Sequence, residues 1–130
     1  MHTPPLILLI DDEPQIRDLF STKLRSAGLE IVEAVNGLAG LSVAKEKKPD
    51  LILLDMRMPV MDGAETIVKL KEDPQTKDIK VVFLTALSDR PEALPTDVKF
   101  AKEVGAADYF KKDIDLNELV SRVKGHLGLQ

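Results

Sequence analysis

The sequence predicts an α/β fold, a (βα)5 three-layer sandwich in which helices cover both faces of a five-stranded parallel sheet. Two observations carry this prediction. Short apolar runs typical of strands recur five times along the 130 residues. Stretches with apolar residues at helical spacing lie between and after these runs, so strands and helices alternate. Strands that alternate with helices form parallel sheets, because each helix carries the chain back to the starting edge.

The strands are predicted directly from the apolar runs, and the crossovers between them are expected to be right-handed. Because parallel sheets are covered by helices on both faces, these runs are expected to be buried. In chain order, the predicted strands are Leu6–Ile10, Ile31–Ala34, Leu51–Asp55, Val81–Thr85 and Asp108–Phe110.

Helices are predicted from apolar periodicity together with the residues that start or stop helices. Gly28 is a C-cap candidate for the first helix, and Thr96 is an N-cap candidate for the fourth. In order, the expected helices run from Ile16 to Ala27, through Leu38–Ala44 until Pro49 prevents continuation, from Asp62-Gly63 to before Pro74, from Thr96 to Gly105, and from Leu116 to Leu127.

Length and composition limit the class of protein. We expect one domain over residues 1–130, with residues 1–5 as a loose arm and no output domain. The chain has no cysteine, which excludes disulfides and thiolate zinc sites. No apolar run approaches the ~20 residues that span a bilayer, and the first residues, MHTPP, do not resemble a signal peptide. A cytoplasmic location without a membrane partner is therefore expected.

The charge balance argues against direct nucleic-acid binding. The net charge is −4 and the pI is about 5.2. The chain contains one Tyr, four Phe and no Trp, and no basic cluster carries interleaved aromatic residues. The electrostatic footprint of a nucleic-acid-binding protein is thus missing.

Carboxylates gather where the predicted strands end. Asp11 and Asp12 follow the first strand, and Asp55 ends the third. Each has an ordinary explanation, because an acid before a helix can cap it and an Asp after a strand commonly forms a turn. Ligands bind open parallel sheets at the carboxyl ends of strands, where these acids converge. Since crowded carboxylates repel one another, the group favours a site for a hard divalent cation, Mg²⁺ or Mn²⁺.

A hydroxyl and a positive charge are expected at the same edge. Thr85 ends the fourth strand, where a β-branched residue can also serve packing alone. Strand alternation places Lys111 and Lys112 on opposite sides, so only one can reach the acids, although a solvated lysine is the ordinary interpretation. Three carboxylates, a hydroxyl and a lysine would suit a phosphoryl group that is accepted on a carboxylate.

Five segments, in this order and at this spacing, resemble the receiver domain of two-component response regulators. They are LLIDDEP, LILLDMRMPVMDG, VVFLTAL, GAADYFKK and DLNEL, and they cover nearly the whole chain. The resemblance implies a flavodoxin-like fold with strand order 2-1-3-4-5. It also implies a phosphorylation-controlled switch rather than an enzyme, one that catalyses only its own phosphoryl acceptance and dephosphorylation.

The resemblance assigns roles to the acids. Asp55 would be the phosphoacceptor. Asp12 would bind Mg²⁺ directly, and Asp11 would assist through water. Arg57, two residues after the acceptor, would supply its backbone carbonyl as a further metal ligand.

The resemblance also assigns the groups that respond to phosphorylation. Thr85 would hydrogen-bond a phosphoryl oxygen, and Lys112 would pair with it. The register Tyr-x-x-Lys selects Lys112 and makes Tyr109 the aromatic residue that changes rotamer with Thr85. Pro59 and Gly63 would shape the turn after the acceptor.

The implied partners are proteins. A histidine kinase or a histidine phosphotransfer protein would donate the phosphoryl group, and a downstream protein or a covalently linked output domain would receive the signal. The fourth helix and fifth strand would carry that signal, and a phosphorylation-dependent homodimer is left open. The rival hypothesis is a receiver-fold interaction module that docks without phosphorylation, against which the full set of site residues argues.

Three features depart from the family pattern. Asp113 follows Lys112 where a proline with a cis bond is usual, so this peptide bond is either trans or strained. The segment 87–100 is longer than usual. Arg57 and Leu87 stand two residues after Asp55 and Thr85, at positions that flank the path of attacking water, and we expect Leu87 to screen the phosphoryl group partly and slow self-dephosphorylation.

Two other classes fit the sequence poorly. A haloacid-dehalogenase-type phosphatase needs a second acid two residues after its nucleophile, where this chain has Arg57. A dinucleotide or flavin binder needs a phosphate-cradling loop after the first strand, but IDDEP is acidic and contains no glycine.

Overall fold

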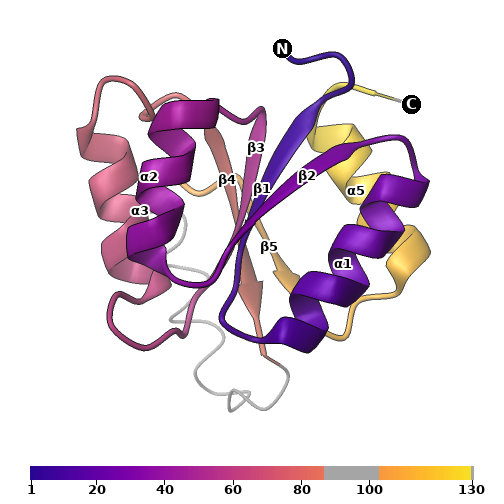
Figure 1. The fold of residues 1–130 in the computed structure, drawn as a ribbon, viewed down its shortest axis with the longest axis horizontal. Helices are drawn as coiled ribbons and strands as arrows, with labels where there is room; N and C mark the ends of the chain where they lie inside the picture. Colours follow the sequence, from indigo (N-terminus) through magenta and orange to yellow (C-terminus); the bar gives the residue numbers. More distant parts are fainter. Residues whose placement is uncertain (87–102, 130) are drawn as a thin grey trace.

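The protein is a three-layer α/β sandwich in the computed structural model, which describes residues 1–86 and 103–129. A five-stranded parallel sheet has the order β2-β1-β3-β4-β5, as predicted. In Figure 1, α2 and α3 lie on one face of this sheet and α1 and α5 on the other. The elements are β1 Leu6–Ile10, α1 Pro14–Ser26, β2 Glu30–Ala34, α2 Gly37–Lys47, β3 Leu51–Asp55, α3 Gly63–Glu72, β4 Lys80–Thr85, β5 Asp108–Lys111 and α5 Leu116–His126.

The predicted elements match these bounds closely. Three strands are one residue longer than predicted, at Glu30, Lys80 and Lys111. Each added residue is charged and pairs in the sheet, so counting apolar residues alone missed it. The fourth helix expected from Thr96 and the residue Leu87 fall on residues 87–102, outside the described residues.

The sheet separates two hydrophobic cores. Side chains alternate along each strand, so Ile7 and Leu9 pack toward α1 and α5, whereas Leu8 and Ile10 pack toward α2 and α3. All five positions of β1 and of β3 are buried, as expected for central parallel strands. Because both faces of the sheet are buried, polar side chains of the sheet can reach solvent at the ends of the strands.

The connections and the helices complete this arrangement. Gly28 follows α1 with φ +90°, a left-handed conformation that glycine adopts without strain. The Lys112–Asp113 bond is trans, since the one cis peptide bond within residues 1–86 and 103–129 is Thr3–Pro4. In the described parts of the chain, no helix has the length and apolar character needed to cross a membrane.

Candidate functional site

The ends of β1 and β3 bring four carboxylates together. Asp11 is fully buried and Asp55 is 2% exposed, while Asp12 is half-buried and Glu13 is exposed. One oxygen from each of the four side chains lies within 4.8 Å of the others. The backbone N–H of Asp11 donates to Ala34 O at 3.1 Å, which continues the β1–β2 pairing and fixes this strand end. The predicted convergence of Asp11, Asp12 and Asp55 is therefore present.

Lys112 places a single positive charge against these acids. Its Nζ lies 3.0 Å from Asp11 Oδ2 and 3.0 Å from Asp55 Oδ2, and it donates a hydrogen bond to Glu13 Oε1. The lysine side chain is only 9% exposed. Its backbone N–H donates to Thr85 O at 2.8 Å, so β4 holds the end of β5 in place. Of the two adjacent lysines, Lys112 is the one that contacts the acids.

Burial shifts the pKa values of Asp11 and Asp55 upward, and one cation shared among three acids only partly offsets this. Burial, together with the charge of Asp11, raises the pKa of Asp55 to about 7. Burial also raises the pKa of Asp11. For Lys112, burial alone would lower the pKa, but hydrogen bonds to Glu13 and Asp11 and the charge of Asp55 outweigh it and raise the pKa. The charged form of Lys112 is stabilised by all three carboxylates that it contacts. The charged form of each carboxylate is stabilised by only its share of one ammonium group.

The residues present fit a divalent cation. Apart from their ion pairs with Lys112, Asp11 Oδ2 and Asp55 Oδ2 are buried and receive no hydrogen bond from the described residues. Four carboxylates lie together, and three of them contact the ammonium group of Lys112, so the cluster carries more negative than positive charge. Magnesium prefers such oxygen ligands and retains several waters, and the half-buried Asp12 and exposed Glu13 show that the cluster reaches solvent.

The loop from β3 to α3 packs closely against Asp55. A Cβ at Gly63 would lie 2.4 Å from Asp55 O and 2.7 Å from Met56 Cα, so only glycine fits here. The N–H of Arg57 donates to Asp55 Oδ1 at 3.2 Å. At the tip of the loop, Val60 is 85% exposed with φ +72°, an unfavourable conformation for a β-branched residue.

Thr85 lies at the end of the strand that pairs with β3. Asp55 pairs with Leu84 in the sheet, and Thr85 is the next residue of β4. Its hydroxyl is buried and has no hydrogen-bond partner within residues 1–86 and 103–129. A buried hydroxyl without a partner is unfavourable, which makes Thr85 a ready donor for a new acceptor at this edge.

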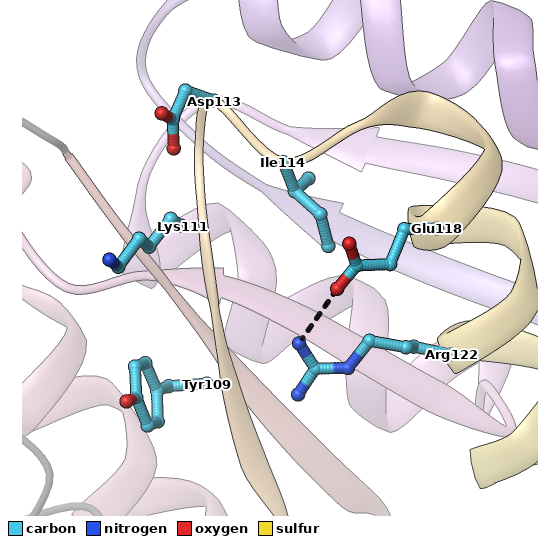
Figure 2. A pocket seen from close by; sticks show the side chains of 6 residues that line it. All are labelled: Tyr109, Lys111, Asp113, Ile114, Glu118 and Arg122. Carbon is cyan, nitrogen blue, oxygen red and sulfur yellow. Dashed lines mark ion pairs between the residues drawn. The ribbon is translucent and has the colours of Figure 1, made fainter.

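Tyr109 lies beside a separate surface pocket of about 320 Å³. Figure 2 shows Tyr109 and Lys111 on one side of β5 and the ion pair of Glu118 with Arg122 on the other. Tyr109 also packs against the core on the α2 and α3 side of the sheet. Tyr109 and Lys111 of β5 thus border this pocket, whereas Phe110 packs in the core on the α1 and α5 side and Lys112, just after the strand, contacts the acids.

Two residues of the site were missed by the sequence prediction. Glu13 contacts Lys112, and Arg17 donates from Nη1 to Asp11 O at 2.8 Å while its Nε lies 3.4 Å from Glu33. The sequence did contain a signal for Glu13. It stands directly before the first helix, where glutamate is not a favoured N-cap residue, which indicates a role other than capping. No comparable signal exists for Arg17, whose partner is a backbone oxygen.

Comparison with known proteins identifies relatives that match most of the chain. The family described as "Response regulator receiver domain" matches residues 7–124. The DNA-binding dual master transcriptional regulator RpaA of Synechocystis is 39% identical over 95% of this chain, and 49% of its own length is covered. Sporulation initiation phosphotransferase F of Bacillus subtilis is 34% identical, with 95% of this chain and 94% of that protein covered. The chain spans about half the length of several curated relatives, RpaA among them.

Solved structures give the same result for the fold. The chemotaxis protein CheY4 of Vibrio cholerae has a TM-score of 0.82 at 28% identity, covering 93% of this chain and 97% of that one. The receiver domain of sensor histidine kinase PA1611 from Pseudomonas aeruginosa has a TM-score of 0.83 at 27% identity, covering 95% and 98%. That structure has a magnesium ion coordinated in its active site cleft. The fold is therefore flavodoxin-like.

Proposed function

Because the chain belongs to the response regulator receiver domain family, we propose that it is a signalling switch controlled by phosphorylation of Asp55. One observation carries the choice of acceptor. Asp55 is buried at a strand end, in contact with the ammonium group of Lys112 and surrounded by further carboxylates. Such a carboxylate can act as a nucleophile whose product remains in contact with a positive charge.

The proposed chemistry is transfer from a phosphohistidine. An oxygen of Asp55 attacks the phosphorus, the P–N bond breaks, and its electron pair stays on the donor imidazole. Lys112 neutralises charge on the transferred group. Asp11, Asp12, Asp55 and the carbonyl of Arg57 would hold Mg²⁺, which when bound supplies further neutralisation of developing charge. The domain is not otherwise an enzyme and catalyses only its own phosphorylation and dephosphorylation.

The proposed switch connects this site to the surface of β5. A phosphoryl group adds negative charge and acceptor oxygens near the hydroxyl of Thr85, which has no hydrogen-bond partner among the described residues. Movement of Thr85 toward that group would leave space for Tyr109, which sits one strand away in register with Phe83. A surface that includes β5 and the segment expected to form the fourth helix would then change its affinity for another protein.

The proposed partners follow from that chemistry. A histidine kinase or a histidine phosphotransfer protein supplies the phosphoryl group in the cytoplasm. A downstream protein, an attached output domain or a second copy of the chain responds to the changed surface. Among the relatives, RpaA is named as DNA-binding and sporulation initiation phosphotransferase F as a phosphotransferase, so both kinds of output occur in the family.

The test is intact mass spectrometry after incubation with acetyl phosphate and Mg²⁺. We expect one added phosphoryl group, which is lost when Mg²⁺ is removed and absent from Asp55→Asn. Asp113→Asn is the matched control, because Asp113 is exposed and one residue from Lys112. Failure to gain a phosphoryl group from acetyl phosphate or from any kinase partner would favour the unphosphorylated interaction module instead.

A further inference from the structure

Glu13 occupies the N-cap position of α1 without capping the helix. Its side chain makes no capping hydrogen bond, and glutamate is not among the favoured N-cap residues. The other described helices begin differently. Asn36, Asp62 and Asp115 are favoured types, and each accepts hydrogen bonds from the first turn of its helix. Helix capping therefore does not explain why glutamate stands at position 13.

The carboxylate of Glu13 is directed to Lys112 instead. Glu13 Oε1 accepts a hydrogen bond from Lys112 Nζ, across 99 positions of the chain. An ammonium group has three N–H donors, and three carboxylates surround this one. Two of them, Asp11 and Asp55, belong to the proposed metal and acceptor set, whereas Glu13 does not.

We propose that Glu13 is a positioning residue that holds the ammonium group of Lys112 over Asp55 throughout the phosphorylation cycle. The inference rests on the proposed function. When Asp55 becomes an acyl phosphate its carboxylate charge moves to the phosphoryl oxygens, and a cation at Asp11 would share that carboxylate. Of the three ion pairs that Lys112 makes within residues 1–86 and 103–129, those with Asp11 and Asp55 thus change, whereas the one with Glu13 persists. A tethered lysine also retains less rotamer freedom to lose in the transition state.

The competing explanation is that Glu13 acts only through its negative charge. Three substitutions at position 13 separate the effect of side-chain length from the effect of charge. Glu13→Gln keeps the length and an oxygen acceptor but removes the charge. Glu13→Asp keeps the charge but is about 1.5 Å shorter, which takes it out of contact with Lys112. Glu13→Ala removes both, and Asp113→Asn controls for loss of one exposed charge near the lysine.

The first measurement is the rate of phosphoryl gain from acetyl phosphate at fixed Mg²⁺. We expect roughly fivefold slower gain in Glu13→Asp and Glu13→Ala, and a rate within about twofold of wild type in Glu13→Gln and Asp113→Asn. A wild-type rate in Glu13→Asp would overturn the proposal. So would equal rates in all four variants.

The second measurement reports on Lys112 without phosphorylation. The side-chain methylene NMR signals of ¹³C-labelled lysine, with Lys112 assigned through Lys112→Arg, should shift and sharpen in Glu13→Asp but stay near wild type in Glu13→Gln. Unchanged Lys112 signals in Glu13→Asp would overturn the inference. If wild type accepts no phosphoryl group, the proposed function fails while these signals still decide the role of Glu13.

Discussion

Lys112 forms ion pairs with three carboxylates, but its single positive charge cannot neutralise all of them. Removing one partner of a buried ion pair usually destabilises a protein, because the other charge is left unpaired. Removal of the Asp55 carboxylate would not leave Lys112 unpaired, because its ion pairs with Asp11 and Glu13 would remain. The residue proposed to carry the chemistry is thus a source of repulsion in the metal-free fold.

Asp55→Asn should therefore stabilise the metal-free protein, by about 1–3 kcal/mol at pH 8. The folded-state pKa of Asp55, about 7, is above the ordinary value of 3.8 that applies to the unfolded chain. Stability from its protonated form is fully present below pH 3.8 and is lost as the pH rises to 7. The advantage of the mutant should be largest above pH 7 and shrink steadily toward pH 4.

Urea unfolding with a chelator present, at pH 8 and pH 5, measures this difference. Asp113→Asn, at an exposed position, should change stability by no more than about 0.5 kcal/mol at either pH. A destabilised Asp55→Asn at pH 8 would mean that Lys112 depends on Asp55 more than on its other two carboxylates.

Among the elements, the loop between β3 and α3 is the most constrained by the site. Its N–H at Gly63 donates to Met56 O at 3.0 Å, which folds the loop back over the end of β3. Backbone atoms of Asp55 and Met56 occupy the position that a Cβ at residue 63 would take. Such atoms cannot rotate away as a flexible side chain can, so Gly63 and Asp55 are positioned together.

Gly63→Ala should destabilise the protein by about 1–3 kcal/mol and slow phosphoryl gain at Asp55. Gly125→Ala is its control, because a Cβ at Gly125 meets nothing within 4 Å and the residue lies inside α5. Alanine there should stabilise the fold by about 0.5–1 kcal/mol. Urea unfolding and the acetyl phosphate assay together test both substitutions. Equal stability of the two variants would show that the loop can move away from β3.

For the whole molecule, cation binding and folding should be linked. The acids come from β1 and β3 and meet only in the folded sheet, so a cation that binds them stabilises the native state. At a Mg²⁺ concentration ten times its Kd, the expected gain is about 1.4 kcal/mol. Thermal unfolding with Mg²⁺ and with NaCl of matched ionic strength measures it. The gain should be absent from Asp12→Asn, and an equal gain with NaCl would indicate simple screening.

The sequence predicted most of the architecture because the strands are apolar throughout and alternate with helices. It also placed Asp11, Asp12 and Asp55 at one edge, since parallel strands end on the same side. It could not predict the contact of Glu13 with Lys112, which depends on side-chain rotamers of residues far apart in the sequence. Nor could it predict the left-handed conformation of Val60, because valine disfavours that conformation and only the surrounding loop imposes it.

The single tyrosine on β5 also makes the protein its own optical probe. The chain has no tryptophan and one tyrosine, so its intrinsic ultraviolet emission comes almost entirely from Tyr109. The ring borders a surface pocket and touches the core, so its quantum yield is sensitive to local solvent access and quenching. Any rearrangement of β5 can thus be followed in real time on the unlabelled chain.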